Sequence, residues 1–174
     1  LRLAVTSGGH CLEGFVCDPE VRVIIDVSPM KRIYHDAERS AVAVEAGATV
    51  GETFKALFDN WGVVLPLGEY PGIGMGGHVP GGAFGFLCRQ LGLAVDYLYA
   101  VEVVTVDAGG KAVPVIATRE LSDPHRELWW AHTGGGAGNF GVVTRYWFRA
   151  SGAFGDEPAK LLPRAPESIT TFKA

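Results

Sequence analysis

Glycine in this 174-residue chain is concentrated in short segments, and this distribution constrains the fold more than any other feature. The chain has 24 glycines, about twice ordinary usage; eight lie between Gly68 and Gly85 and five between Gly134 and Gly141. Because glycine costs backbone entropy, such clusters between apolar strands indicate backbone that packs closely against a ligand. We also expect the Gly- and Pro-rich segment Leu65–Gly82 to contain no regular structure.

A third glycine turn lies near the start of the chain, in VTSGGHC, where Gly8 and Gly9 directly precede His10. Bare backbone N–H groups at such turns form concavities that bind anions and suit a pyrophosphate. Each turn taken alone has a simpler interpretation as a tight loop. Three of them in one domain, two with a Gly-Gly-His sequence, favour a large ligand with a phosphate spine.

Apolar periodicity predicts an α+β fold in which strands are clustered and helices are few. The expected strands and hairpins are Leu3–Thr6, Val21–Val27, Ile33–Asp36 with Ala41–Glu45, Tyr97–Val106 with Lys111–Ile116, and Gly141–Phe148. Short helices are expected over Phe84–Leu91 and Pro124–Ala131. The pattern is not a regular alternation of strands and helices.

One longer helix is expected after Thr49, an N-cap that forms a capping box with Glu52. Gly62 ends this helix. Helical spacing of apolar residues predicts a buried face made of Phe54, Leu57, Phe58 and Trp61.

Residues 1–150 are expected to form one domain. Residues 151–174 are polar and Pro-rich, which indicates a linker or the start of a second domain. Because the chain begins inside an apolar strand pattern and without a methionine, we expect a piece of a longer protein, with the N-terminal part of the domain outside it.

Two segments satisfy the GxGxxG pattern, Gly72–Gly77 and Gly136–Gly141. A Rossmann dinucleotide site needs a strand before this motif and a long helix after it. The first segment follows a loop and leads into more glycines, and the second follows a helix and leads into a strand, so both contexts argue against that site. Neither GxxxxGK[ST] nor GxSxG occurs, which excludes an ordinary P-loop and a nucleophile elbow.

Composition argues against several other classes. The formal net charge is −4 without a basic stripe, and no run approaches a membrane span, so neither nucleic acid nor a membrane is an expected partner. The histidines lack metal-ligand spacing, so no metal is expected. The three cysteines, Cys11, Cys17 and Cys88, fit no disulfide framework, and we expect reduced, mostly buried thiols. The compartment stays open, with the cytoplasm favoured.

The three glycine turns together resemble the FAD-binding domain, of the PCMH type, of the vanillyl-alcohol-oxidase superfamily, and are most similar to berberine bridge enzyme-like oxidases. SGGH at Ser7–His10 resembles the loop whose histidine bonds covalently to the flavin. PGIGMGGHVPGGAFGFLCRQLGLAVD, Pro71–Asp96, resembles the glycine segment beside the flavin, and LWWAHTGGGAGNFGVVT, Leu128–Thr144, resembles the segment before the last strand of the domain. The resemblance covers residues 1–150 and implies most of that fold, with the substrate domain largely missing.

By this resemblance, His10 is the attachment residue for FAD, and Ser7, Gly8 and Gly9 contact the FAD pyrophosphate. The remaining cofactor-binding residues that it implies are Cys11, Gly74, Gly76, Gly77, His78, Gly81, Gly82, Gly138, Asn139, Gly141 and Val143.

The chain also departs from the family pattern. Thr6 stands where arginine is common, and Ala83 stands in place of a frequent glycine. Many relatives bond a second residue, a cysteine, to the flavin; here Tyr70 takes its place, Cys88 lies well past it, and Cys11 is not the second link. We therefore expect one covalent bond, through His10.

The implied activity is that of an oxidase. A sugar or natural-product alcohol or hemiacetal passes a hydride to covalently bound FAD, and O2 reoxidises the flavin to give H2O2. The catalytic base is unknown and is expected in the missing domain. Two alternatives remain, a non-covalent FAD dehydrogenase or reductase of the same fold and a non-catalytic module that keeps the flavin fold.

Overall fold

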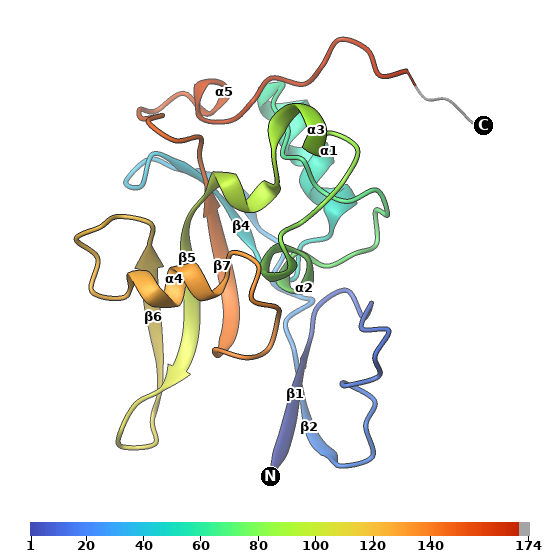
Figure 1. Cartoon of the computed structure of the whole chain (residues 1–174), viewed down its shortest axis with the longest axis vertical. Coiled ribbons are helices and arrows are strands. Elements are labelled where there is room, and N and C mark those ends of the chain that lie inside the picture. Colours follow the sequence, from blue (N-terminus) through green and yellow to red (C-terminus); the bar gives the residue numbers. More distant parts are fainter. Residues whose placement is uncertain (171–174) are drawn as a thin grey trace.

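The main body of the protein is built on one five-stranded antiparallel sheet (Figure 1). The computed structural model describes residues 1–170. The strand order is β3-β4-β7-β5-β6. These strands are β3 (Ile33–Asp36), β4 (Ala41–Glu45), β5 (Leu98–Val106), β6 (Ala112–Thr118) and β7 (Val142–Phe148). The predicted hairpins and last strand are therefore present within one or two residues, and the α+β class is confirmed.

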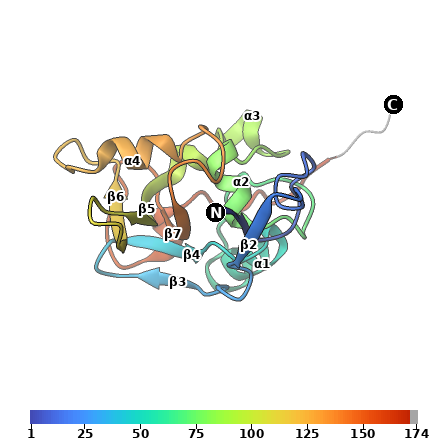
Figure 2. The same ribbon diagram turned by 90° about the horizontal axis from the view of Figure 1, so that it is seen from below.

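Both faces of the sheet are covered, which explains why β4 is buried along its whole length. Successive side chains of a strand point to opposite faces. On β7, Tyr146 and Phe148 pack into the main core with Leu57 of α1 (Val50–Trp61), whereas Trp147 packs on the other face with Ala43. Figure 2 shows α4 (Arg126–Ala131) packed along the sheet and β3 at the sheet edge, where it pairs with β4.

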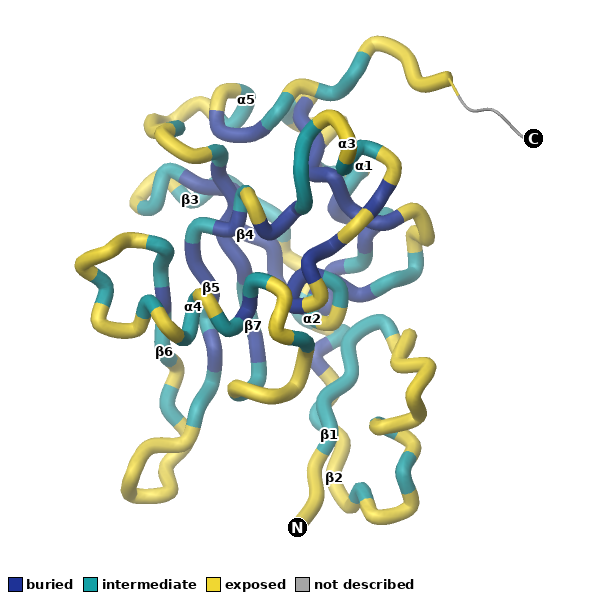
Figure 3. The backbone as a smooth tube through the Cα atoms, viewed as in Figure 1, coloured by how far each residue is buried: buried dark blue, intermediate teal, exposed yellow. Residues whose placement is uncertain are grey.

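A second, smaller sheet projects from this body. It consists of β1 (Arg2–Thr6) and β2 (Val21–Asp26), which pair in parallel. Most of this unit is exposed or intermediate in burial, in contrast to the buried centre of the body (Figure 3). Its inner end joins the body where the hydroxyl of Ser7, directly after β1, donates to the carbonyl of Ala46, directly after β4, at 2.7 Å. The turn that follows β1 is thereby held against the main sheet.

Helix α1 has the ends that the sequence predicts. Thr49 accepts from the N–H of Glu52, and the Glu52 carboxylate accepts from the N–H of Thr49, which completes the capping box. Gly62 ends the helix in the left-handed conformation with φ of 65°. Of the predicted buried face, Leu57 is fully buried and Phe54 and Trp61 pack partly buried against the core, but the prediction is wrong at Phe58, which is 58% exposed.

The glycine-rich segment contains regular structure, contrary to expectation. Short helices α2 (Met75–His78) and η1 (Val79–Gly81) lie inside the stretch predicted to be irregular. Tertiary contacts outweigh the low helix propensity of glycine there: Met75 and Val79 are fully buried, and the N–H of Met75 donates to the carbonyl of Ala48 at 2.8 Å. The predicted helix over Phe84–Leu91 is reduced to α3 (Cys88–Leu91) and is followed by η2 (Ala94–Tyr97).

The segment after β7 returns to the body. Helix α5 (Pro158–Leu161) carries the buried Leu161, and Val64 donates its N–H to the carbonyl of Pro163 at 2.9 Å. Residues 151–174 are predicted to form a linker or the start of a second domain, and of these, residues 171–174 lie outside the described residues.

The cysteines are free, as expected, but not mostly buried. Cys11 and Cys17 are exposed, and Cys88 is intermediate. Both exposed thiols lie in the irregular loop between β1 and β2, which has no core of its own.

Replacement of Thr49 by alanine is predicted to lower the free energy of unfolding by about 1 kcal/mol, because one half of the capping box is lost. Urea denaturation of the full-length protein measures this change. Thr49→Ser keeps the hydroxyl and serves as the control. A loss as large in Thr49→Ser as in Thr49→Ala would contradict the capping role.

Candidate functional site

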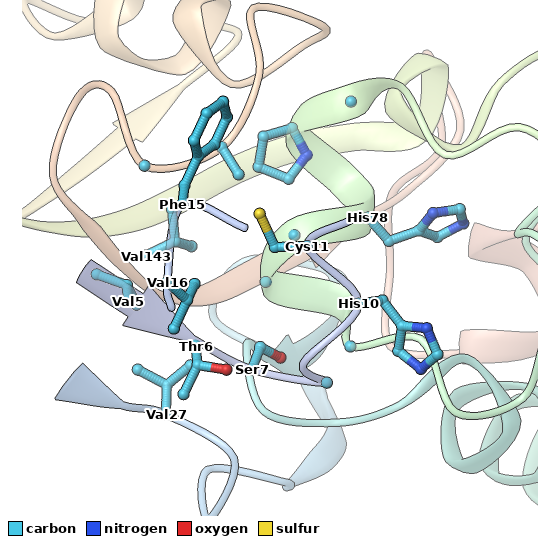
Figure 4. A pocket seen from close by; sticks show the side chains of 18 of the residues that line it. Val5, Thr6, Ser7, His10, Cys11, Phe15, Val16, Val27, His78 and Val143 are labelled. Atoms are coloured by element: carbon cyan, nitrogen blue, oxygen red, sulfur yellow. The ribbon is translucent and has the colours of Figure 1, made fainter. Parts of the chain in front are cut away.

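A cavity of about 1000 Å³ lies where the turn after β1 meets the two glycine-rich segments (Figure 4). Its walls come from β1, from α2 and η1, and from the loop between α4 and β7. This volume is at the upper end for small-molecule sites, so the cavity suits a large ligand. The three turns that the sequence singles out, far apart along the chain, therefore border one space.

The cavity lining includes every residue expected to bind the cofactor except Gly82. The predicted residues in the lining are Ser7, Gly8, Gly9, His10, Cys11, Gly74, Gly76, Gly77, His78, Gly81, Gly138, Asn139, Gly141 and Val143. Gly82 is buried outside the lining, where it caps η1 with φ of 103° and donates its N–H to the carbonyl of Val79. Backbone conformation alone explains why this residue is glycine.

Several lining glycines are required by contacts within the chain. A Cβ on Gly8 would overlap the backbone nitrogen of Gly74, and a Cβ on Gly74 would overlap the hydroxyl of Ser7. A Cβ on Gly76 would lie 2.9 Å from the carbonyl oxygen of Ala46, which also accepts a 2.7 Å hydrogen bond from the Ser7 hydroxyl. These glycines allow the turn after β1 to lie directly on the segment before α2.

Other lining glycines are required by backbone conformation. Gly9, Gly138 and Gly141 have φ of 74°, 77° and 128°, values that L-residues with a side chain rarely adopt. Ala83, which replaces a frequent glycine of the family, has φ of 57°. An alanine there costs about 1–2 kcal/mol relative to a right-handed conformation, so the backbone at this position is strained.

At Gly77 and Gly81, neither close contacts within the chain nor backbone conformation requires glycine. Both lie in short helical segments, neither has a left-handed φ, and a Cβ built on either would meet nothing within 4 Å. Both are exposed and line the cavity. Alanine would favour these helices, so nothing in the described part of the chain explains glycine here. The two glycines leave the cavity open along this stretch of backbone.

His10 presents its ring at the end of the turn. It lies on the opposite side of the turn from the side chain of Cys11, which points toward the Phe15 side of the cavity (Figure 4). The ring of Tyr70 meets the His10 ring edge to face, with centroids 5.1 Å apart. Cys11 and His10 therefore face different parts of the same site.

The imidazole of His78 is engaged with the protein. Its Nε2 accepts a 2.8 Å hydrogen bond from the N–H of Gly68, so the neutral ring carries its proton on Nδ1. Burial lowers the pKa of His78 below its ordinary value. This residue lines the cavity, but its ring nitrogen holds the loop before Tyr70 in place.

Sequence reasoning missed part of the wall. The missed lining residues include Arg2 to Thr6, Phe15, Val16, Pro80, Phe84 and Ala137. Phe15 and Phe84 are 62% and 72% exposed, which is unusual for large apolar side chains beside a cavity. Phe15 lies in an irregular loop, so no periodicity could have assigned it to this wall.

Within residues 1–170, no group of three or more His, Cys, Asp or Glu side chains has the arrangement of a metal site. None of the helices in the described part of the chain is sufficiently long and apolar to span a membrane. Neither GxGxxG segment lies in a Rossmann unit: one runs into α2, and the other lies between α4 and β7.

A model of the FAD binding domain family matches residues 1–114. The chain belongs to this family.

Known relatives agree with this assignment. Aclacinomycin-N/aclacinomycin-A oxidase of Streptomyces galilaeus is 60% identical over 167 residues, which are 96% of this chain and 31% of that protein. Berberine bridge enzyme-like 25 of Arabidopsis thaliana is 35% identical over 180 residues, 99% of this chain and 29% of that protein. The chain thus spans about a third of the length of these relatives, and the predicted resemblance is confirmed.

A solved structure agrees as well. A glycopeptide hexose oxidase complexed with teicoplanin superimposes with a TM-score of 0.92 and 53% identity, covering 95% of this chain and 33% of that one. The PCMH-type oxidase fold is therefore shown for the described residues.

The cavity fits FAD. The open glycines Gly77 and Gly81 leave room that side chains would fill, and the walls combine polar turn backbone with apolar side chains such as Val143. We expect the turn at Ser7–Gly9 to hold the pyrophosphate, as the resemblance implies.

Gly77→Ala and Gly81→Ala are predicted to keep or slightly raise the free energy of unfolding, by up to about 1 kcal/mol, because alanine is a better helix former. FAD affinity is predicted to fall about tenfold or more, since the new methyl group occupies ligand space. Fluorescence titration of FAD in a His10→Ala background, together with urea denaturation, measures both quantities.

Gly74→Ala is the contrasting control, because its Cβ would overlap Ser7 and the fold itself should be destabilised. Normal FAD affinity in both Gly77→Ala and Gly81→Ala would contradict the assignment of this wall to the cofactor.

Stability is predicted to fall as pH drops below about 6.5, the ordinary pKa of histidine. Because the folded-state pKa of His78 is lowered, the unfolded chain takes up a proton that the folded chain does not, so the stability present above 6.5 is lost on acidification. Burial also lowers the pKa of His132, which adds to the slope. Thermal unfolding of His78→Gln between pH 7.5 and 5.5 should show a smaller slope, and an unchanged slope would exclude His78 as the cause.

Proposed function

We propose that the full-length protein is an FAD-dependent oxidase that removes a hydride from an alcohol or hemiacetal of a sugar or natural product and passes the electrons to O2, giving H2O2. We propose further that FAD is attached covalently through His10. The observation that carries the proposal is the position of His10 at the end of the turn that lines the cavity beside Gly77 and Gly81.

The surroundings of His10 suit an attachment residue. The residue is exposed, and within residues 1–170 its ring nitrogens have no hydrogen-bond partner that would occupy their lone pair. The backbone before it is fixed, since Gly8 lies on Gly74 and Ser7 is bonded to Ala46. A reactive side chain on a rigid support is the arrangement that a precise bond-forming step requires.

The covalent attachment of FAD to His10 is an oxidation, and O2 accounts for the electrons and protons that it releases. The new bond joins an imidazole nitrogen to the 8α carbon of the flavin, and one hydrogen leaves each of the two atoms. The two protons and two electrons reduce one O2 to H2O2. The step therefore needs no other co-reactant.

When bound, FAD supplies the redox chemistry, and an attached imidazole makes its ring more electron-poor and a better hydride acceptor. The chain supplies position and shape. The turn at Ser7–Gly9 binds the phosphate groups, the helical wall at Gly77 and Gly81 lies against the cofactor, and Val143 closes the cavity from the sheet. We expect the catalytic base in the substrate domain.

The substrate class rests on the relatives. The solved relative with 53% identity is a glycopeptide hexose oxidase, and a hexose oxidase of Chondrus crispus is among the similar proteins. Both names describe oxidation of a sugar, and the relative with 60% identity is also an oxidase. These names favour an oxidase over a dehydrogenase that excludes O2.

Mass spectrometry of the denatured full-length protein is predicted to find FAD bonded to the peptide that contains His10. In His10→Ala the flavin should separate on acid precipitation, because no other residue is expected to form the bond. Cys11→Ser is the matched control and should keep the adduct. FAD that separates from the wild-type protein under the same conditions would contradict covalent attachment, and an adduct retained in His10→Ala would place it elsewhere.

The oxidase proposal has a separate test. Hexoses and glycosylated natural products, supplied with O2, are predicted to give H2O2 in proportion to the oxygen consumed. Turnover that occurs only with an artificial electron acceptor would instead support a dehydrogenase.

A further inference from the structure

The site contains an aromatic contact beside His10 that FAD binding alone does not explain. The Tyr70 and His10 rings meet at an interplanar angle of 62°, the edge-to-face arrangement that aromatic pairs favour. Tyr70 is 59% exposed, so the ring is not simply a core residue. From these contacts we propose that Tyr70 is the positioning residue of His10, which holds the imidazole in the orientation for flavin attachment; the proposal rests on covalent attachment through His10.

Gly72 provides the room for this contact. A Cβ on Gly72 would lie 2.9 Å from Cε1 of Tyr70 and 3.5 Å from Nε2 of His10. Gly72 has no left-handed φ, so its conformation does not require glycine. The rings of Tyr70 and His10, which lie close to Gly72, explain why this residue has no side chain. One edge of the imidazole thus faces Gly72 and Tyr70.

The loop that carries Tyr70 is firmly anchored. The start of α1 holds it through two hydrogen bonds, from Val50 N–H to the carbonyl of Ile73 at 2.8 Å and from Gly51 N–H to the carbonyl of Pro71 at 2.9 Å. On its other side the bond from Gly68 to His78 fixes the chain two residues before Tyr70. The phenol ring therefore rests on a rigid backbone, as a positioning group requires.

His10 itself has few other constraints. It is exposed at the end of a turn, and an exposed side chain samples several rotamers on a fast timescale. The edge-to-face contact favours the rotamer in which the ring lies against Tyr70. Since attachment requires one imidazole nitrogen to reach the 8α carbon, with one hydrogen lost from each atom and O2 taking the electrons, the population of that rotamer sets the attachment rate.

This role predicts a specific effect of ring removal. An aromatic pair of this geometry favours one arrangement by roughly two- to tenfold in equilibrium terms, so Tyr70→Ala should slow FAD attachment by about that factor. Tyr70→Phe keeps the ring and should attach FAD at the wild-type rate. Neither change should alter the thermal unfolding midpoint by much, because the side chain is mostly exposed.

The experiment follows attachment over time after FAD is added to the full-length apoprotein, with acid-stable flavin quantified by mass spectrometry. Phe86→Ala is the matched control, because Phe86 is a 71% exposed aromatic residue that does not line the FAD cavity. A parallel titration in the His10→Ala background measures non-covalent FAD affinity, which Tyr70→Ala should leave within about twofold of its starting value.

Slower attachment in Tyr70→Ala, with wild-type rates in Tyr70→Phe and Phe86→Ala, supports the proposal. A wild-type rate in Tyr70→Ala overturns it while leaving His10 attachment intact. Weaker non-covalent binding or a lower unfolding midpoint in Tyr70→Ala also overturns it, since the residue would then act on the fold or on FAD binding in general. If the wild-type protein forms no adduct, the proposed covalent attachment fails, and this inference with it.

Discussion

The contact between Gly8 and Gly74 is the constraint on which the rest of the site depends. The two backbones approach so closely that a Cβ on either residue would overlap the other segment. This approach joins the projecting β1–β2 unit to the body of the domain and creates the cavity between them. Ser7 strengthens it by donating its hydroxyl proton to the carbonyl of Ala46 at 2.7 Å, which ties the turn to the end of β4.

The glycines of the site divide into three physical groups. Gly8, Gly74 and Gly76 allow chain segments to touch, and Gly9, Gly138 and Gly141 allow a left-handed backbone. Gly77 and Gly81 serve neither purpose and leave open space along the cavity wall. Only Gly77 and Gly81 indicate a ligand directly. The other glycines of the site are explained within the chain, so a high glycine content does not by itself measure how much backbone a ligand contacts. The chain belongs to the FAD binding domain family, and FAD is the ligand that we propose for this open wall.

Much of this organisation follows from the sequence, because it depends on local signals. The capping box at Thr49, the left-handed Gly62 and the β-branched strands fix α1 and the sheet without knowledge of the tertiary structure. The helix α2 could not be predicted, since its glycines favour disorder and tertiary contacts hold it, among them the bonds from Met75 and Gly76 to the carbonyls of Ala48 and Ala46.

The site could be predicted only where a motif marks it. The turns at Ser7–His10 and Gly138–Gly141 carry such motifs, and the structure places them on one cavity. Gly82 belongs to the matching segment Pro71–Asp96 but lies outside the cavity lining, because a sequence pattern does not distinguish a helix cap from a ligand contact. Phe15 carries no signal at all, since its position depends on how the loop between β1 and β2 folds over the cavity. The pairing of Tyr70 with His10 likewise appears only in three dimensions.

The most direct test of this account is an experimental structure of the full-length protein with FAD bound. In that structure we expect atoms of FAD in van der Waals contact, about 4 Å, with the Cα atoms of both Gly77 and Gly81, and the pyrophosphate on the turn at Ser7–Gly9. A structure in which FAD leaves these two glycines open to solvent would contradict the proposal that Gly77 and Gly81 are glycine because the cofactor lies on them.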